Sequence, residues 1–198
     1  MNRVITISRE FGSGGREIGF RLSEKLGIPF YDREIISMAA ESSNIAEAAF
    51  HDNDERIAAQ ERVDHEYVTV NPFSSSYEIP VPDQLFLAQL RVIRQLARRG
   101  PCVIIGRCSD IIVENSFHVF ICSSMKKRVE RIKGMEPELT AKKVESRIRE
   151  IDSKRRDYYQ YYTGNEWGNP RAYDLCLNSG RLGVEGCVNM IAACVGLV

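Results

Sequence analysis

The sequence lacks any excess of charge of one sign. Its 198 residues include 27 lysines and arginines and 27 aspartates and glutamates, so the formal net charge at pH 7 is zero. Such a chain has no global field that would attract nucleic acid or an anionic membrane surface. We therefore expect neither nucleic acid nor membrane among its partners, and any basic site has to be local.

Long hydrophobic runs and paired cysteines are also missing. No apolar run approaches the roughly 20 residues that a membrane span needs, and the N-terminus has no apolar signal core. This pattern favours buried free thiols over a disulfide framework or metal ligands, so we expect no metal site made by the chain alone, and a reducing cytoplasm. The six cysteines show no C-x-x-C spacing and mostly lie in apolar stretches: Cys102, Cys108, Cys122, Cys176, Cys187 and Cys194.

Strand-like and helix-like segments alternate along a chain with the size of a single domain. With 43% hydrophobic residues, 1–198 can bury one core, and no internal repeat divides it. The alternation favours a parallel sheet with helices on both faces, an α/β fold. Apolar runs predict a strand that begins near residue 4 and others at 28–31, 102–105, 117–122 and 173–177. Apolar periodicity predicts helices over 16–26 and 34–66. Three further helices are predicted to begin after the caps Asp83, Ser124 and Thr140, and a last one follows a predicted turn at 178–183.

The stretch VITISREFGSGGREIG, residues 4–19, joins a strand to a helix through a glycine-rich turn. Backbone N–H groups and the positive end of a helix dipole converge at such a turn, which suits a polyphosphate. Gly12, Gly14 and Gly15 allow positive φ angles and close approach around Ser13, and Arg16 can hold phosphate oxygens as a bidentate cation. A glycine-rich turn that binds nothing has the same local pattern.

This turn departs from the P-loop motif G-x-x-x-x-G-K-[ST]. With Gly15 as its second glycine, the motif asks for glycine, lysine and a hydroxyl residue where this chain has Glu10, Arg16 and Glu17. Arginine can replace the charge of lysine, whereas a glutamate in place of the magnesium-binding hydroxyl changes the local charge and the metal geometry. We take residues 12–17 as the candidate donor-phosphate loop.

Charged side chains follow two of the predicted strands. Asp32 and Arg33 come just after 28–31, and Arg107 follows 102–105. Open α/β sheets bind ligands at these strand ends, so the three residues and nearby Asp110 are candidates for the acceptor site. Two other interpretations remain open: Asp32 can cap a helix, and Arg107 can simply pair with Asp110.

The helix after Asp83 and the segment before it show no further site. Gln89 and Arg91 lie off the apolar stripe of that helix, so we expect both to be solvated. Prolines and serines in 68–82 predict a loop or a short hairpin that can move.

The segment 126–156 has roughly twice as many basic as acidic residues. A solvated helix is the ordinary interpretation of such a charge run. Several guanidinium groups beside a phosphate loop would also stabilise a transferring phosphoryl group. The candidates for that role are Arg147, Arg149, Arg155 and Arg156.

Together these landmarks resemble the cytidylate kinase-like branch of the P-loop nucleoside monophosphate kinases. ISREFGSGGREIG resembles the phosphate loop, YDREII the acceptor-site motif, VIIGR the strand whose arginine holds the monophosphate, RIREIDSKRR the arginine-rich lid, and LCLNSGRLGVEGCVNMI the final strand, loop and helix. The resemblance covers nearly the whole chain and implies a P-loop NTPase fold of three layers, with strand order 2-3-1-4-5, an acceptor-side helical region at about 34–82 and a helical lid at about 126–162.

The resemblance implies transfer of the γ-phosphoryl group of ATP, with Mg²⁺, to a nucleoside monophosphate, with CMP or dCMP as the expected acceptor. Residues 12–16 would hold the donor phosphates, and Arg107, with Arg33 nearby, would hold the acceptor phosphate. Asp32 would orient the acceptor or a metal-bound water. The missing lysine and hydroxyl leave two alternatives: a nucleotide-binding regulatory module without transfer activity, and a kinase of another small metabolite.

Overall fold

The computed structural model describes residues 4–43, 45 and 79–197. Within them, parallel strands form one five-stranded sheet in the order β2-β3-β1-β4-β5. Ile5 of the central strand lies opposite Val103 on one side and Phe117 on the other. This order confirms the P-loop kinase arrangement that the resemblance implies. The strands are β1 (Ile5–Arg9), β2 (Phe30–Tyr31), β3 (Val103–Ile105), β4 (Phe117–Cys122) and β5 (Leu175–Asn178).

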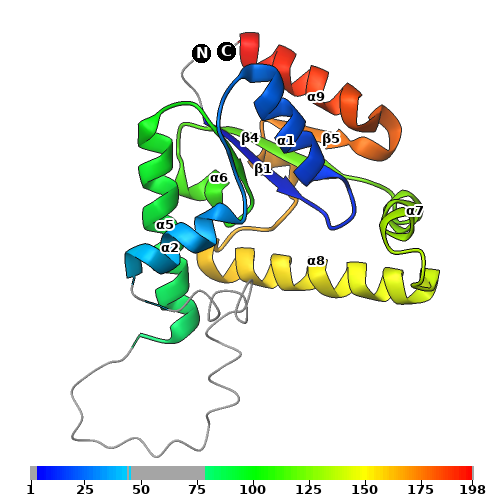
Figure 1. Cartoon of the computed structure of the whole chain (residues 1–198), viewed down its shortest axis with the longest axis horizontal. Coiled ribbons are helices and arrows are strands. Elements are labelled where there is room, and N and C mark those ends of the chain that lie inside the picture. Colours follow the sequence, from blue (N-terminus) through cyan, green and yellow to red (C-terminus); the bar gives the residue numbers. More distant parts are fainter. Residues whose placement is uncertain (1–3, 44, 46–78, 198) are drawn as a thin grey trace, which may run out of the picture.

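Helices cover both faces of this sheet (Figure 1). Alternate side chains of each strand point to opposite faces, so Ile5 and Ile7 pack under one layer of helices while Val4 and Ile104 pack under the other. The first layer consists of α1 (Gly15–Leu26) and α9 (Ser179–Leu197), and the second of α2 (Glu34–Ser43), α5 (Val81–Arg99) and α6 (Ser109–Ile112).

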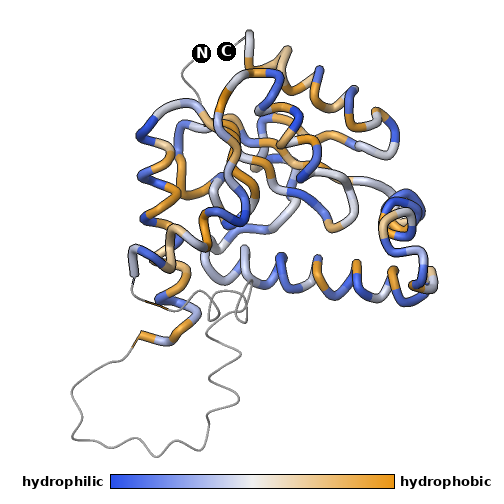
Figure 2. Tube along the Cα trace, viewed as in Figure 1, coloured by the Kyte–Doolittle hydropathy of each residue, from blue (hydrophilic) through white to orange (hydrophobic). Residues whose placement is uncertain are grey.

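Two further helices, α7 (Met125–Met135) and α8 (Ala141–Thr163), lie beside these layers (Figure 1), and the C-terminal part of α8 packs Tyr158 and Tyr159 into the core of the second layer. The α8 helix runs beside the end of the sheet where β1 ends, and both helices are hydrophilic over much of their length (Figure 2). Two of the three predicted caps are confirmed, because the side chains of Ser124 and Thr140 accept hydrogen bonds from the N–H groups of Lys127 and Lys143. After α8, the short 3-10 helix η1 (Pro170–Ala172) leads to β5.

Some element boundaries differ from the sequence predictions. Asp83 does not cap α5, so that prediction is wrong. The helix begins at Val81 with Pro82 in its first turn, where a missing N–H costs nothing. The Asp83 carboxylate instead accepts a hydrogen bond from the Tyr162 hydroxyl at 2.9 Å. The predicted turn at 178–183 is mostly helical, since α9 begins at Ser179 and is interrupted only at Gly183, where φ is 70°. Of the helix predicted over 34–66 and the loop predicted over 68–82, residues 44, 46–66 and 68–78 lie outside the described residues.

The cysteines are free thiols, as the sequence indicates. Cys102, Cys108 and Cys187 are buried, and Cys176 is exposed. Burial raises the pKa of the Cys102 thiol to about 11, because the thiolate would lose its hydration. Among the helices of the described residues, none is both long and apolar enough to span a bilayer.

Candidate active site at the carboxyl ends of the strands

The glycine-rich turn connects β1 to α1 and takes the conformation that its glycines permit. Gly12 and Gly14 have φ angles of 79° and 81°, and Gly14 caps α1 directly. The first N–H groups of α1 have no partner within the helix and carry the positive end of its dipole. The turn therefore has the geometry of an anion-binding helix N-terminus, and its role as a phosphate site stays a prediction.

Ser13 shapes this loop from inside. Its N–H and its hydroxyl group both donate to the carbonyl oxygen of Glu10, at 3.2 and 2.8 Å. The Ser179 hydroxyl, at the start of α9, donates to the carbonyl oxygen of Ser13 at 2.5 Å. Ser13 is fully buried, so its polar atoms fix the turn rather than face solvent.

A buried ion pair holds the loop from the side of α7 and α8. Arg128 and Asp152 form a salt bridge, and both are nearly inaccessible to solvent. The Phe11 N–H donates to Asp152 Oδ1 at 2.8 Å, and Arg128 Nε donates to the Phe11 carbonyl oxygen at 2.7 Å. Each polar group of the Phe11 backbone thus has a charged partner.

Neither Arg128 nor Asp152 was predicted as a site residue. One signal was available for Asp152: it follows Val144 and Ile148 at intervals of four residues and continues the buried stripe of α8. A carboxylate at such a position needs a buried partner, and the basic segment supplies one.

Glu17 is engaged on the outer side of the loop. Its carboxylate pairs with Arg21 at 2.7 Å and with Arg131 at 3.2 Å. The Arg131 guanidinium lies over Gly14, where a Cβ atom would stand 2.9 Å from Arg131 Cζ. Arg131 therefore adds positive charge beside the loop, and it was not among the predicted site residues.

Arg16 is bonded to a carboxylate at the end of β2. Its Nε donates to Asp32 Oδ2 at 2.6 Å, and its guanidinium lies 5.9 Å from the centroid of the Phe30 ring. The Asp32 side chain is 7% exposed and the Arg16 side chain 61%. The structure thus brings these two predicted residues together at the end of β2, while Arg33 is exposed beside them.

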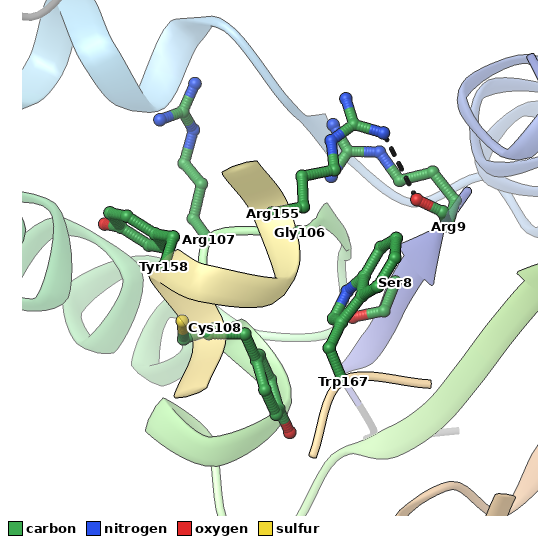
Figure 3. Close-up of a pocket in the computed structure, with 9 residues that line it drawn as sticks. Ser8, Arg9, Gly106, Arg107, Cys108, Arg155, Tyr158 and Trp167 are labelled. Carbon is green, nitrogen blue, oxygen red and sulfur yellow. Dashed lines mark hydrogen bonds between the residues drawn. The ribbon is translucent and has the colours of Figure 1, made fainter. Parts of the chain in front are cut away.

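Arg107 projects from the end of β3 into a pocket. Its backbone is left-handed, with φ at 57°, and its Nη1 donates to Gln89 Oε1 at 3.0 Å. Gln89 is buried, so the prediction that it is solvated is wrong: the guanidinium of Arg107 supplies the partner that makes its burial possible. The residues that line this pocket are Ser8, Arg9, Gly106, Arg107, Cys108, Arg155, Tyr158, Tyr159 and Trp167 (Figure 3).

The four arginines predicted on α8 separate into two groups. Arg155 lines the pocket and donates from Nη1 to the Arg9 carbonyl oxygen at 3.2 Å. Arg147 and Arg155 both lie over the Phe11 ring, at 5.6 and 5.9 Å, and Arg147 also bonds Glu136. Arg149 forms an exposed pair with Glu145 within the helix, and Arg156 is exposed, so the structure does not bring these two to the pocket.

Asp110 lies beneath the pocket instead of on its surface. It is buried, and its Oδ2 accepts a hydrogen bond from the Tyr159 hydroxyl at 2.7 Å. Burial raises the pKa of Asp110 above its ordinary value, although the Tyr159 hydrogen bond and the charge of His118 act in the opposite direction. Burial and the Asp110 charge also raise the pKa of the Tyr159 phenol.

This raised pKa makes a prediction about stability. The folded state retains the Asp110 proton at a pH where the unfolded chain has lost it. The protonated carboxyl therefore contributes its full stabilisation of the folded state below about pH 3.8, and this stabilisation is lost as the pH rises through the folded pKa. Asp110→Asn removes this titration. Its unfolding free energy relative to wild type should therefore increase from pH 4.5 to pH 7.5 in urea titrations. Parallel curves for the two proteins would contradict the assignment. Tyr159→Phe keeps the carboxyl group but removes the hydrogen bond that lowers its pKa, so stability should still fall with rising pH in that variant.

The arrangement defines the class of protein. Three features lie at the carboxyl end of this P-loop-type sheet: a glycine-rich loop, a pocket with three arginines and an arginine-bearing helix beside both. This combination is typical of a phosphoryl-transfer enzyme. Residues 4–181 match the cytidylate kinase-like family. The chain belongs to this family, and it is a nucleotide kinase of the nucleoside monophosphate class.

A curated relative supports this assignment over almost the full length. The chain is 31% identical to a cytidylate kinase of Archaeoglobus fulgidus over 195 residues, which are 96% of this chain and 93% of the relative. The phosphate-loop, strand-end and basic-segment residues predicted from the sequence all lie within the matched range 4–181.

Solved structures confirm the fold. An uncharacterized protein from Eubacterium ventriosum superposes with a TM-score of 0.71 at 24% identity and 98% coverage of both chains. A shikimate kinase from Bacteroides thetaiotaomicron superposes with a TM-score of 0.56 at 12% identity and 99% coverage of both. At these identities the likeness concerns the fold alone.

Proposed function

We propose that this protein transfers the γ-phosphoryl group of ATP to CMP or dCMP. The observation that carries the proposal is the Arg107 pocket at the carboxyl ends of β1 and β3: Arg107 and Arg155 line it together with Arg9, which precedes the glycine-rich loop, so an acceptor phosphate held there would be near the donor phosphates. Family membership and the cytidylate kinase relative support the choice of acceptor.

In this proposal the loop from Gly12 to Glu17 binds the donor phosphates through its N–H groups. Arg107 holds the acceptor phosphate, and Asp32 accepts hydrogen bonds from the acceptor or from water. Arg33 and Asp110 support that side, Arg33 from the surface and Asp110 from below. Of the four arginines predicted to close over the transferring group, Arg147 and Arg155 already lie over the Phe11 ring, whereas Arg149 and Arg156 are exposed and would join them only after a movement of α8. Positioning and charge neutralisation provide most of the catalysis of phosphoryl transfer, so the proposal needs no side-chain nucleophile.

The same proposal assigns regions of the single domain 1–198. Residues 34–82 form the acceptor side and 126–162 the lid. Closure of the lid would exclude water, because a kinase that transfers to water wastes ATP.

Magnesium fits this site as an ion carried mainly by the phosphates of ATP. Mg²⁺ usually keeps several waters and takes one or two protein carboxylates, so a cage of protein ligands is not required. Within the described residues, no three His, Cys, Asp or Glu side chains cluster as metal ligands. Asp32 is the carboxylate at the strand end that suits such a water-mediated role, and the ion would neutralise phosphate charge.

A coupled assay with ATP, Mg²⁺ and a panel of nucleoside monophosphates tests the proposal. We expect turnover with CMP and dCMP to exceed that with AMP, GMP and UMP. Tight ATP binding without turnover of any acceptor would instead indicate a regulatory module. Transfer to shikimate or to another small hydroxylated metabolite, with no turnover of nucleotides, would identify a different kinase.

Arg16 has an expected effect of its own in this assay. If Arg16 leaves Asp32 during turnover and its charge then assists the separating γ-phosphoryl group, Arg16→Ala should lower kcat by about 10²-fold while ATP affinity changes little, because the interaction strengthens in the transition state. Arg16→Lys should recover part of the loss. Near-wild-type turnover of a folded Arg16→Ala protein would remove Arg16 from the mechanism.

A further inference from the structure

The conformation of the phosphate loop favours a P-loop register one residue earlier than a count from Gly15. The motif places its second glycine directly before the helix, and in this structure that residue is Gly14, which caps α1. The lysine position of the motif then falls on Gly15 and its first glycine position on Arg9. This chain therefore has Arg9 at the position of the first motif glycine, and Gly15 at the position of the motif lysine.

Arg9 occupies the space that a side chain at position 15 would need. A Cβ atom on Gly15 would lie 2.5 Å from Arg9 Cβ and 3.0 Å from Arg9 Cγ, so a larger residue there cannot coexist with the Arg9 side chain. Farther along, a Cβ atom on Gly106 would overlap Arg9 Nη1. Because both positions are glycine, the Arg9 side chain can extend from the end of β1, past Gly15 at the start of α1, to Gly106, next to Arg107.

This path brings the Arg9 guanidinium into the pocket that Arg107 and Arg155 also line (Figure 3). The lining residues include these three arginines and no carboxylate. The hydrogen bond from Arg155 to the Arg9 carbonyl oxygen ties the pocket to α8. Arg16, in contrast, is bonded to Asp32.

We infer that Arg9 supplies the charge that lysine supplies in an ordinary P-loop, and that its guanidinium binds the β- and γ-phosphate oxygens of ATP. The inference rests on the proposed function for its donor nucleotide. Arg9 extends from beside Gly15 to Gly106, and its planar fork can donate hydrogen bonds to two phosphate oxygens at once. It stays protonated throughout, so it neutralises charge and transfers no proton.

Calorimetric titration of the full chain with ATP and with CMP tests this role. Arg9→Gln should weaken ATP binding at least 30-fold and change CMP binding less than threefold, whereas Arg9→Lys should retain most of the ATP affinity. Arg94→Gln removes the same charge from an exposed position on α5 and is the matched control. Unchanged ATP affinity in Arg9→Gln, or a larger loss for CMP than for ATP, would overturn the inference.

A paired substitution tests the shared space directly, and it also serves where Arg9→Gln folds poorly. Gly15→Lys alone should clash with Arg9 and lower the melting temperature. Combining Arg9→Gly with Gly15→Lys restores the ordinary motif positions, so this double variant should bind ATP at least tenfold more tightly than Arg9→Gly. A folded double variant that binds no better than Arg9→Gly would show that the two side chains are not equivalent.

These outcomes separate the inference from the proposed function. A wild-type protein that binds ATP but phosphorylates no nucleoside monophosphate would refute the proposed acceptor and leave the Arg9 comparison intact. A wild-type protein that phosphorylates CMP, with Arg9→Gln equally active and equally tight for ATP, would refute only the role of Arg9. Absence of ATP binding in the wild type would refute both before any variant is compared.

Discussion

Replacing Arg107 with glutamine should lower kcat/KM for CMP about 10³-fold while the KM for ATP changes less than threefold. The guanidinium emerges from the end of β3 with its backbone fixed at a positive φ, and Gln89 orients it from the adjacent α5. Loss of one preorganised charged donor costs roughly 4 kcal/mol of transition-state stabilisation where the charge is not replaced. Steady-state kinetics with each substrate varied in turn measures both constants.

Gln89→Met provides the graded control for this result. The substitution keeps a side chain of similar length on α5 but removes the acceptor of the Arg107 hydrogen bond, so Arg107 keeps its charge and loses its orientation. We expect a fall of about tenfold in kcat/KM for CMP, well short of that for Arg107→Gln. If Arg107→Gln phosphorylates CMP with unchanged kcat/KM, the acceptor phosphate binds elsewhere.

The sheet and the phosphate loop were predictable because their signals are local. A short apolar run such as 103–105 predicts a strand buried on both faces, and the glycines at 12 and 14 predict a turn with positive φ angles. The strand order came from the resemblance to a family instead, since alternation of strands and helices is compatible with several orders.

The side chains that organise the site were harder to predict because their partners lie far away in the sequence. Arg9 is placed by Gly15 and Gly106, and Gln89 is buried only because Arg107 reaches it. Arg16 has the right position for a phosphate ligand, yet a carboxylate sixteen residues later holds it at the end of β2. No local pattern encodes these contacts, so the loop could be predicted but not the direction of its cations.

The Arg128–Asp152 pair should be the most sensitive point for stability. Asp152→Ala removes the nearer of the two carboxylates that pair with buried Arg128, leaving Glu10 Oε2 at 3.5 Å, and it removes the acceptor of the Phe11 N–H. Breaking a buried pair typically costs about 3–5 kcal/mol, so with Glu10 still present we expect the unfolding free energy to fall by about 3 kcal/mol in urea titrations. An exposed carboxylate on the same helix, Glu150, provides the matched control: Glu150→Ala should leave the urea unfolding curve close to that of the wild type.

A double variant separates the charge from its contacts with the loop. Arg128→Met combined with Asp152→Leu removes both charges, so much of the stability lost in Asp152→Ala should return. The Phe11 N–H and carbonyl groups would still lack their partners, and the glycine-rich turn would lose the contacts that fix it against α7 and α8. We therefore expect ATP affinity to remain at least tenfold below wild type in a double variant that is folded and stable. Wild-type ATP affinity in that protein would show that the pair stabilises the domain without shaping the phosphate loop.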